Sequence, residues 1–128
     1  MIELSTVFVD PASVPPLSPA DRPIDVAHLA RMTLGDASLE REVLQLYDRQ
    51  AEMLLARMRM AATKAAAAHA HTLKGSSRGI GAWNVADAAE AVELAANGNG
   101  ADVVAAISHL GTAIGEARMV IADLLRAH

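Results

Sequence analysis

"ADVVAAISHLGTAIGEARMVIADLL", residues 101–125, carries the clearest structural pattern in the chain. Its apolar residues return every three or four positions, as they do on the buried side of an amphipathic helix. The series consists of Val103, Ile107, Leu110, Ile114, Ala117, Ile121 and Leu124. Such a sustained alternation is typical of the seam between packed helices. The stretch therefore predicts a long helix that packs against other helices.

Three further helices are expected upstream. The first runs from about Asp36 or Ser38 to Met60, the second follows Thr63 and is bent or ended by the glycines at 78–84, and the third covers about 83–96. Two glycine-rich breaks separate the later helices, "RGIGAWN" at 78–84 and "NGNG" at 97–100. The 83–96 segment has one apolar face, made of Val85, Ala88, Ala89 and Val92. The 36–60 segment has an apolar stripe at the spacing of a buried face, formed by Leu39, Val43, Leu46, Gln50 and Met53. Thr63 is the expected cap of the helix that follows.

A short helix is expected before these four. Asp25 is its predicted N-cap, and Ile24 and Leu29 are spaced for a hydrophobic staple around that cap. Gly35 is the predicted stop. The fold class is therefore all-α, an antiparallel four-helix bundle with a short extra N-terminal helix.

Composition agrees with this fold class. Hydrophobic residues make up 52% of the 128 residues but aromatic residues only 2%, so Ala, Leu, Val, Ile and Met must build the core. That mixture favours helices over strands. Cysteine is absent, which excludes disulfides, thiolate metal sites and a cysteine nucleophile.

The chain divides into a Pro-rich N-terminal arm, 1–23, and a helical bundle domain, 24–128. The arm holds all five prolines of the protein and cannot form a helix interior. Its first residues lack the basic region of a signal peptide, and no apolar stretch is long enough to span a bilayer. We therefore expect a cytoplasmic protein that is not associated with a membrane.

Charge is distributed unevenly along the chain. The net charge of -4 argues against non-specific nucleic-acid binding. Between Met53 and Ala86, however, there is no Asp or Glu, and the only charged residues are basic: Arg57, Arg59, Lys64, Lys74 and Arg78. One interpretation is a surface for an acidic partner or an anionic group, and the other is an ordinary solvated charge run.

The cluster "AHAHTLKGSSRGIGAW", residues 68–83, is the strongest candidate for a functional site. At about 100° per residue, Lys74, Gly75 and Arg78 fall within about 60° of His71 on a helix. Ala67 and Ala68 share that face, whereas Ala66, Leu73, Ser76 and Ile80 fall on the opposite side. His69 also lies opposite, roughly 160° from His71, and is interpreted as a packed or boundary residue.

Metal binding is not expected, because two imidazoles at this spacing cannot reach one ion and no neighbouring acid completes a zinc site. The His71 face instead suits phosphoryl transfer. A neutral imidazole is a nucleophile near pH 7. A lysine one turn away, Lys74, would stabilise phosphoryl oxygens, with Arg78 as a second, looser contact. Gly75 removes a side chain beside the ring, and Ala67 and Ala68 extend a flat surface on which another protein can approach.

At these residues the sequence resembles the histidine-containing phosphotransfer (HPt) family. The resemblance is carried by "HTLKGSS" followed by "RGIGA", and it is dense over residues 68–82. It implies that His71 is the phosphoacceptor, Lys74 the charge-stabilising residue, Gly75 the residue that provides clearance, and Ser76 the small residue that follows. It also implies a two-component phosphorelay with receiver domains of response regulators or hybrid histidine kinases as partners.

The resemblance extends to "YDRQAEML", residues 47–54, where a glutamine of some family members hydrogen-bonds the imidazole. Here that glutamine would be Gln50; the other interpretation leaves its amide in solvent at the edge of the stripe. No cofactor is expected in this chain, because Mg²⁺ and the acidic pocket should come from the receiver.

Two other functions remain as alternatives. A kinase-type dimerisation domain also presents a phosphorylatable histidine, although an acidic residue usually follows it where this chain has Thr72. A helical interaction module could dock an acidic partner without phosphorylation. The chain has no Gly-rich nucleotide-binding segment, so no ATP-dependent kinase activity is expected of it. Whether a stoichiometric carrier of this kind counts as an enzyme is left open.

Overall fold

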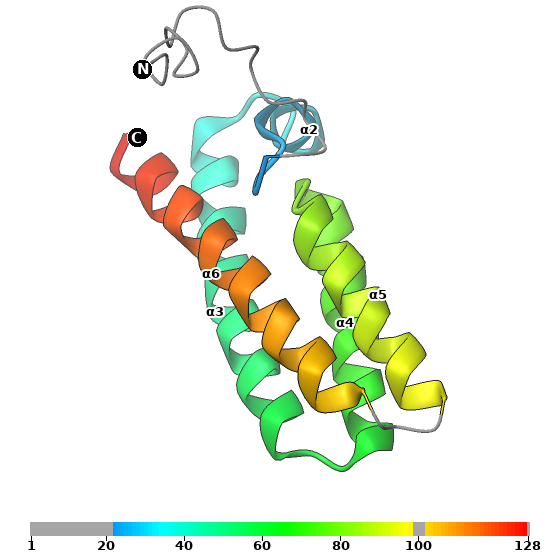
Figure 1. The fold of residues 1–128 in the computed structure, drawn as a ribbon. Coiled ribbons are helices and arrows are strands. Elements are labelled where there is room, and N and C mark those ends of the chain that lie inside the picture. Colours follow the sequence, from blue (N-terminus) through cyan, green and yellow to red (C-terminus); the bar gives the residue numbers. More distant parts are fainter. Residues whose placement is uncertain (1–21, 99–101, 128) are drawn as a thin grey trace, which may run out of the picture.

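The computed structural model describes residues 22–98 and 102–127, and the regular secondary structure of these residues is entirely helical. The helices, coloured along the chain in Figure 1, are α2 (Val26–Met32), α3 (Ala37–Met60), α4 (Thr63–Ile80), α5 (Trp83–Asn97) and α6 (Val103–Ala127). Their bounds agree closely with the ranges that the sequence predicts. The all-α fold class is therefore confirmed.

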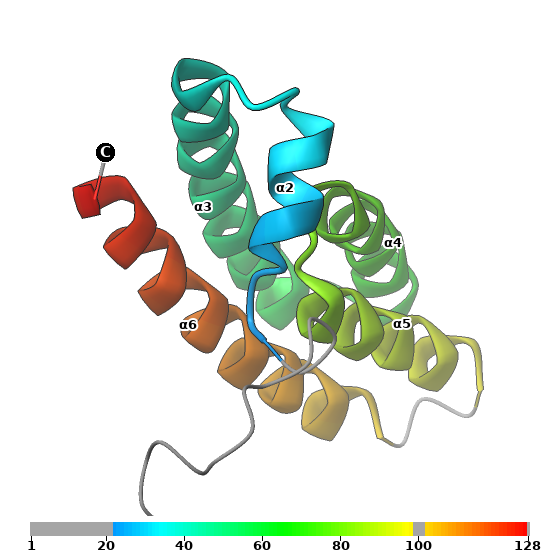
Figure 2. The same cartoon turned by 90° about the horizontal axis from the view of Figure 1, so that it is seen from above.

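The four long helices form an antiparallel bundle. Each packs against its neighbours in the order α3, α4, α5, α6, and α6 closes the ring against α3. The view from above in Figure 2 shows this arrangement, with α2 lying across one end of the bundle. The seam predicted for α6 is confirmed, because Val103, Ile107, Leu110, Ile114, Ala117 and Ile121 are buried and Leu124 is half-buried.

Asp25 ties α2 to the turn between α4 and α5. It is the N-cap of α2, as predicted, and one of its carboxylate oxygens accepts a hydrogen bond from the His28 amide at 3.1 Å. The other oxygen accepts from Trp83 Nε1 at 3.0 Å. The Asp25 amide donates to the Gly81 carbonyl at 2.9 Å. These bonds hold the short helix against the start of α5.

Gly81 is the left-handed residue that ends α4, with φ of +84°. A Cβ at this position would lie 2.9 Å from the Asp25 carbonyl oxygen. Only glycine combines this backbone conformation with so close an approach. The predicted break at "RGIGAWN" is thus a tight turn to which the start of α2 is hydrogen-bonded.

The stripe predicted on α3 is not its buried face. The residues that α3 buries are Leu44, Tyr47, Ala51, Leu54, Leu55 and Met58. The predicted residues instead form an exposed or half-buried line, here called the outer stripe: Leu39, Val43, Leu46, Gln50, Met53 and, seven residues further, Met60. Both sets have the 3–4 spacing of a helix face, so periodicity alone does not tell which one packs inward.

Packing decides between the two faces of α3. Ala51 is fully buried, and Tyr47 places its hydroxyl 2.7 Å from the buried Ser77 hydroxyl of α4. This polar contact is satisfied inside the bundle, which removes the cost of burying both groups. The inward face of α3 therefore includes a tyrosine with a polar hydroxyl and one small residue, Ala51, neither of which stands out in a pattern of large apolar residues.

Two smaller expectations have different outcomes. Thr63 is the first residue of α4 rather than its cap; Ala62 occupies the N-cap position and makes no side-chain cap bond. Residues 1–21 of the predicted Pro-rich arm, and positions 99 and 100 of the predicted "NGNG" break, lie outside the described residues.

Candidate functional site

His71 stands on the exposed side of α4. The residues that this helix buries are Ala66, Ala70, Leu73, Ser77 and Ile80. The His71 side chain is 71% exposed. The predicted separation of this histidine from the packed face is therefore what the structure shows.

A carboxylate from the neighbouring helix joins His71 to Lys74. Glu93 of α5 lies with Oε2 2.9 Å from His71 Nδ1 and with Oε1 2.6 Å from Lys74 Nζ. The side chains of Glu93 and Lys74 are each only 17% exposed. One carboxylate thus connects the exposed ring to a largely covered ammonium group.

This contact defines which nitrogen of the ring carries a proton. An ionised carboxylate can only accept hydrogen bonds, so Nδ1 of His71 must donate to Glu93. In the neutral ring Nε2 then holds the lone pair. The ring is consequently oriented with a nucleophilic nitrogen away from Glu93.

Glu93 is ionised over most of the pH range. Desolvation by burial raises its pKa, but hydrogen bonds from Lys74 and His71 outweigh this and hold the pKa below its ordinary value. The charges of Lys74 and His71 act in the same direction. The carboxylate therefore remains available as an acceptor wherever His71 is neutral.

Arg78 is held in a second contact between α4 and α5. Its guanidinium lies 3.1 Å from Glu90 Oε1, and its side chain is 52% exposed. Its backbone oxygen lies 3.1 Å from His28 Nε2 of α2. Since that oxygen can only accept, His28 Nε2 donates. Arg78 lies on the His71 face as expected, but with its charge already paired.

Small residues near His71 lie at or close to the surface of α4. Gly75 and Ala68 are exposed, and Ala67 is half-buried. A Cβ added to Gly75 would meet nothing within 4 Å, so the space beside His71 is open.

The structure does not bring Gln50 to the imidazole. Gln50 is half-buried on α3, in a groove between α3 and α4 that Ser76 and Tyr47 also line. The hydrogen-bond partner of the imidazole is instead Glu93, at Nδ1. Ser76 is half-buried, and its hydroxyl donates to the Thr72 carbonyl at 3.3 Å.

Glu93 is the site residue that sequence reasoning missed, because it lies 22 positions after His71. One signal could have revealed it. Glu90 and Glu93 are three residues apart on α5, and Arg78 and Lys74 are four apart on α4. In an antiparallel pair of helices joined by a short turn, these acids and bases come opposite one another.

Among residues 22–98 and 102–127, no three His, Asp or Glu side chains gather as a metal site would require. No described helix combines the length and apolar character needed to cross a bilayer.

Comparison with known proteins identifies a family. The family model described as the Hpt domain matches residues 42–126, which is more than half of the chain and includes His71, Lys74 and Glu93. No curated protein and no solved structure matches the chain.

Proposed function

Because the chain belongs to the Hpt domain family, whose members are phosphotransfer modules of two-component systems, we propose that it is a phosphoryl carrier of a phosphorelay. In this proposal His71 accepts a phosphoryl group from the aspartate of one receiver domain and passes it to another receiver. The observation that supports it most is the exposed imidazole whose Nδ1 is engaged by Glu93.

The transfer step follows from the orientation of the ring. Nε2 of His71 attacks the phosphorus of the receiver's aspartyl phosphate in line with the bond to the carboxyl oxygen. The P–N bond forms, the P–O bond breaks, and the receiver keeps the carboxylate. The ring gains positive charge as the bond forms, and Glu93 stabilises it because the Nδ1 proton stays hydrogen-bonded to the carboxylate. The reverse sequence delivers the group to the next receiver.

Lys74 contributes charge beside the transferred group. Phosphoryl transfer depends chiefly on positioning and on stabilising the equatorial oxygens. Lys74 lies one turn from His71 and is held in place by its 2.6 Å contact with Glu93. That contact holds its ammonium group on the Nδ1 side of the ring, one helical turn from His71, with Arg78 further along the same face as a looser contact.

The receiver reaches His71 over the open surface around Gly75 and Ala68, with Ala67 and Ser76 at its edges. The metal ion and acidic pocket of the reaction belong to the receiver in this proposal. The basic stretch from Arg57 to Arg78 attracts that acidic partner, so association should weaken as salt is added.

The test is transfer of label from a phosphorylated receiver to this protein. The wild-type protein should acquire acid-labile, alkali-stable label, and His71→Gln should acquire none while its helical circular dichroism is unchanged. His69→Gln is the matched control, since His69 is half-buried on the same helix and should keep transfer intact. Receiver binding without any labelling would leave the interaction module as the function. Labelling that is lost in His69→Gln but kept in His71→Gln would show that His69, and not His71, accepts the phosphoryl group.

A further inference from the structure

The outer stripe of α3 is a mostly apolar line that the bundle leaves largely exposed, although Val43 packs in part against the core. Four of its members are spaced seven residues apart, with exposed fractions of 40% at Leu39, 55% at Leu46, 44% at Met53 and 89% at Met60. Val43 and Gln50 lie between them and are half-buried. A repeat of seven is the spacing by which one helix meets another. The stripe therefore has the form of a helix-packing seam on the outside of the bundle.

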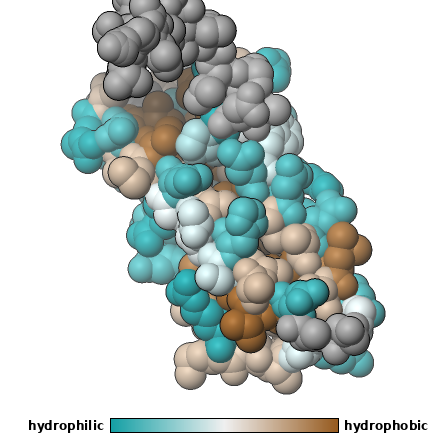
Figure 3. All heavy atoms as spheres, in the orientation of Figure 1, coloured by the Kyte–Doolittle hydropathy of each residue, from teal (hydrophilic) through white to brown (hydrophobic). Residues whose placement is uncertain are grey.

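The apolar side chains exposed elsewhere do not form such a line. Leu94 lies on α5, and Val104 and Met119 lie at distant positions on α6. The others lie on the short helix α2 or directly after it: Val26, Met32 and Leu34. On the face over α5 and α6 that Figure 3 shows, apolar residues appear in small groups between hydrophilic ones. Single exposed apolar residues of this kind are normal on a soluble protein. The outer stripe is different because its members lie along one face of a single helix at a regular spacing.

A groove accompanies the seam on the side of α4. It has a volume of about 350 Å³ and is lined by Val43, Leu46, Tyr47, Gln50, Ser76 and Ile80. Its walls are mostly apolar side chains from two helices. A groove of this kind accepts side chains that project from a third helix.

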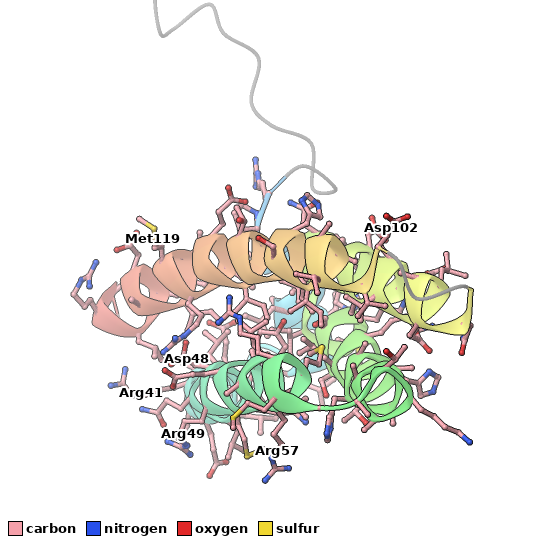
Figure 4. All side chains as sticks on the ribbon, turned by 60° about the horizontal axis from the view of Figure 1, so that its bottom comes forward. Arg41, Asp48, Arg49, Arg57, Asp102 and Met119 are labelled. Atoms are coloured by element: carbon pink, nitrogen blue, oxygen red, sulfur yellow. The ribbon has the colours of Figure 1, made fainter. Side chains whose placement is uncertain are left out.

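Charged residues on the other edge of the seam indicate which helix fits. Glu42 and Arg49 are exposed, lie seven residues apart, and form no salt bridge within the residues that the structure describes. In Figure 4 Arg49 points away from the bundle, whereas Asp48 lies toward α6, where it binds Arg118. The edge thus offers one negative and one positive charge to a partner.

A single twofold axis would pair both the apolar and the charged residues of the seam with those of a second copy. Leu46 lies midway between Leu39 and Met53 in the sequence, and the midpoint of Glu42 and Arg49 falls within one residue of Leu46. A twofold axis through Leu46 would therefore place Leu39 opposite Met53 of a second copy. The same axis brings Glu42 of each copy beside Arg49 of the other, so the pair forms twice. Isologous dimer interfaces are self-complementary in this way.

The geometry points to a homodimer in which the outer stripe of α3 packs antiparallel against the outer stripe of a second copy. Leu46 meets itself at the centre, and two Glu42–Arg49 ion pairs set the register. This inference does not depend on the proposed function. His71 belongs to the side of α4 that contacts α5 through Glu93, whereas the seam lies on α3. Its groove shares Ser76 with the edge of the surface proposed for the receiver.

The test measures the mass of the full chain in solution by sedimentation equilibrium over a wide concentration range. The wild-type protein should change from monomer to dimer as concentration rises. Glu42→Arg and Arg49→Glu should each weaken the dimer at least about tenfold, because each places like charges together at two places in the interface. The double variant, with both charges exchanged, should restore dimerisation.

Two further variants check the centre and the specificity of the interface. Leu46→Asp should abolish the dimer, whereas Met119→Asp, on an exposed part of α6, should leave it unchanged. The inference is overturned if the wild-type protein is monomeric at every concentration, or if the double charge exchange fails to restore the dimer. It is also overturned if Leu46→Asp changes only the binding of a receiver to a monomeric protein.

The labelling experiment separates this inference from the proposed function. The monomeric Glu42→Arg variant should still accept a phosphoryl group, because its substitution is remote from His71, Lys74 and Glu93. Loss of the dimer with labelling intact supports both proposals. A dimer that never acquires label would overturn the phosphoryl-carrier function and leave the interface standing.

Discussion

Glu93 orients the His71 ring through a single hydrogen bond, the one that its carboxylate accepts from Nδ1. The bond from Nδ1 at 2.9 Å keeps the proton on that nitrogen and leaves the lone pair on Nε2, the atom to which the proposal assigns the phosphoryl group. Glu93→Gln should therefore slow transfer to His71 by about one order of magnitude, in the range found when the hydrogen-bond partner of a metal-binding histidine is removed. Rates of receiver-to-protein transfer measure the effect, and the imidazole nitrogen chemical shifts show the loss of the preferred tautomer.

The control for this substitution is Glu90→Gln, one turn away on α5, which removes the partner of Arg78 and should affect transfer much less. Equal rates in wild type and Glu93→Gln, with the tautomer unchanged, would contradict the orienting role of Glu93.

Lys74 is the second residue to which the proposed function gives a role. Lys74→Ala should reduce the transfer rate by up to about 100-fold without preventing receiver binding, because it removes a positive charge beside the phosphoryl oxygens. Single-turnover transfer and a separate binding titration distinguish the two effects. Lys64→Ala on the same helix is the matched control, since Lys64 is exposed and near the opposite end of α4. A wild-type transfer rate in Lys74→Ala would refute the charge-stabilising role.

At the scale of elements, the turn between α4 and α5 determines whether Glu93 can reach His71. Gly81 allows α4 to end and α5 to return along it, which brings Glu90 and Glu93 opposite Arg78 and Lys74. The same turn also holds α2 in place, because Asp25 forms hydrogen bonds with Gly81 and Trp83. The site is therefore a property of the helix pair rather than of α4 alone.

Gly81→Ala should lower the free energy of unfolding by about 2 kcal/mol or more, because the positive φ strains alanine and its Cβ would lie 2.9 Å from the Asp25 carbonyl oxygen. Gly79→Ala is the contrasting variant. Gly79 is within α4 and an added Cβ meets nothing within 4 Å, so alanine should raise the free energy of unfolding by about 0.5–1 kcal/mol. Urea denaturation midpoints measure both changes. Equal midpoints in the two variants would show that the turn does not need glycine.

At the scale of the whole molecule, a buried polar contact joins α3 to α4 across the core. Burial raises the pKa of Tyr47 to about 12, although its hydrogen bond with Ser77 acts in the opposite direction. In the unfolded chain a tyrosine ionises near pH 10. The folded protein therefore holds the proton more tightly, and stability that is complete below pH about 10 should be lost as the pH rises toward about 12.

The expected slope is at most about 1.4 kcal/mol per pH unit, measured by urea denaturation at alkaline pH. Tyr47 is the only tyrosine of the chain, so tyrosinate absorbance reports its ionisation directly. Tyr47→Phe should remove this part of the pH dependence, and at neutral pH it should lower stability by about 1–3 kcal/mol because Ser77 loses its buried partner. An identical alkaline profile in Tyr47→Phe would show that another group is responsible.

Much of this molecule follows from local pattern. The helix ranges, the Asp25 cap, the buried seam of α6 and the outward direction of His71 depend on spacing within one segment, and a helix fixes the direction of each side chain from its position in the sequence. The face of α3 that packs inward did not follow, because two stripes of equal periodicity compete on that helix. The buried Tyr47–Ser77 contact and the small Ala51 select one of them only when α4 lies alongside.

The partner of His71 was likewise decided by tertiary structure. Gln50 and Glu93 belong to different helices, and which of them reaches Nδ1 depends on how α3 and α5 pack around α4. Hydrogen bonds and ion pairs act over about 3 Å, whereas the residues that form them here are separated by tens of positions in the chain. The sequence by itself determined four long helices and an exposed histidine; the packing of those helices determined which carboxylate orients it.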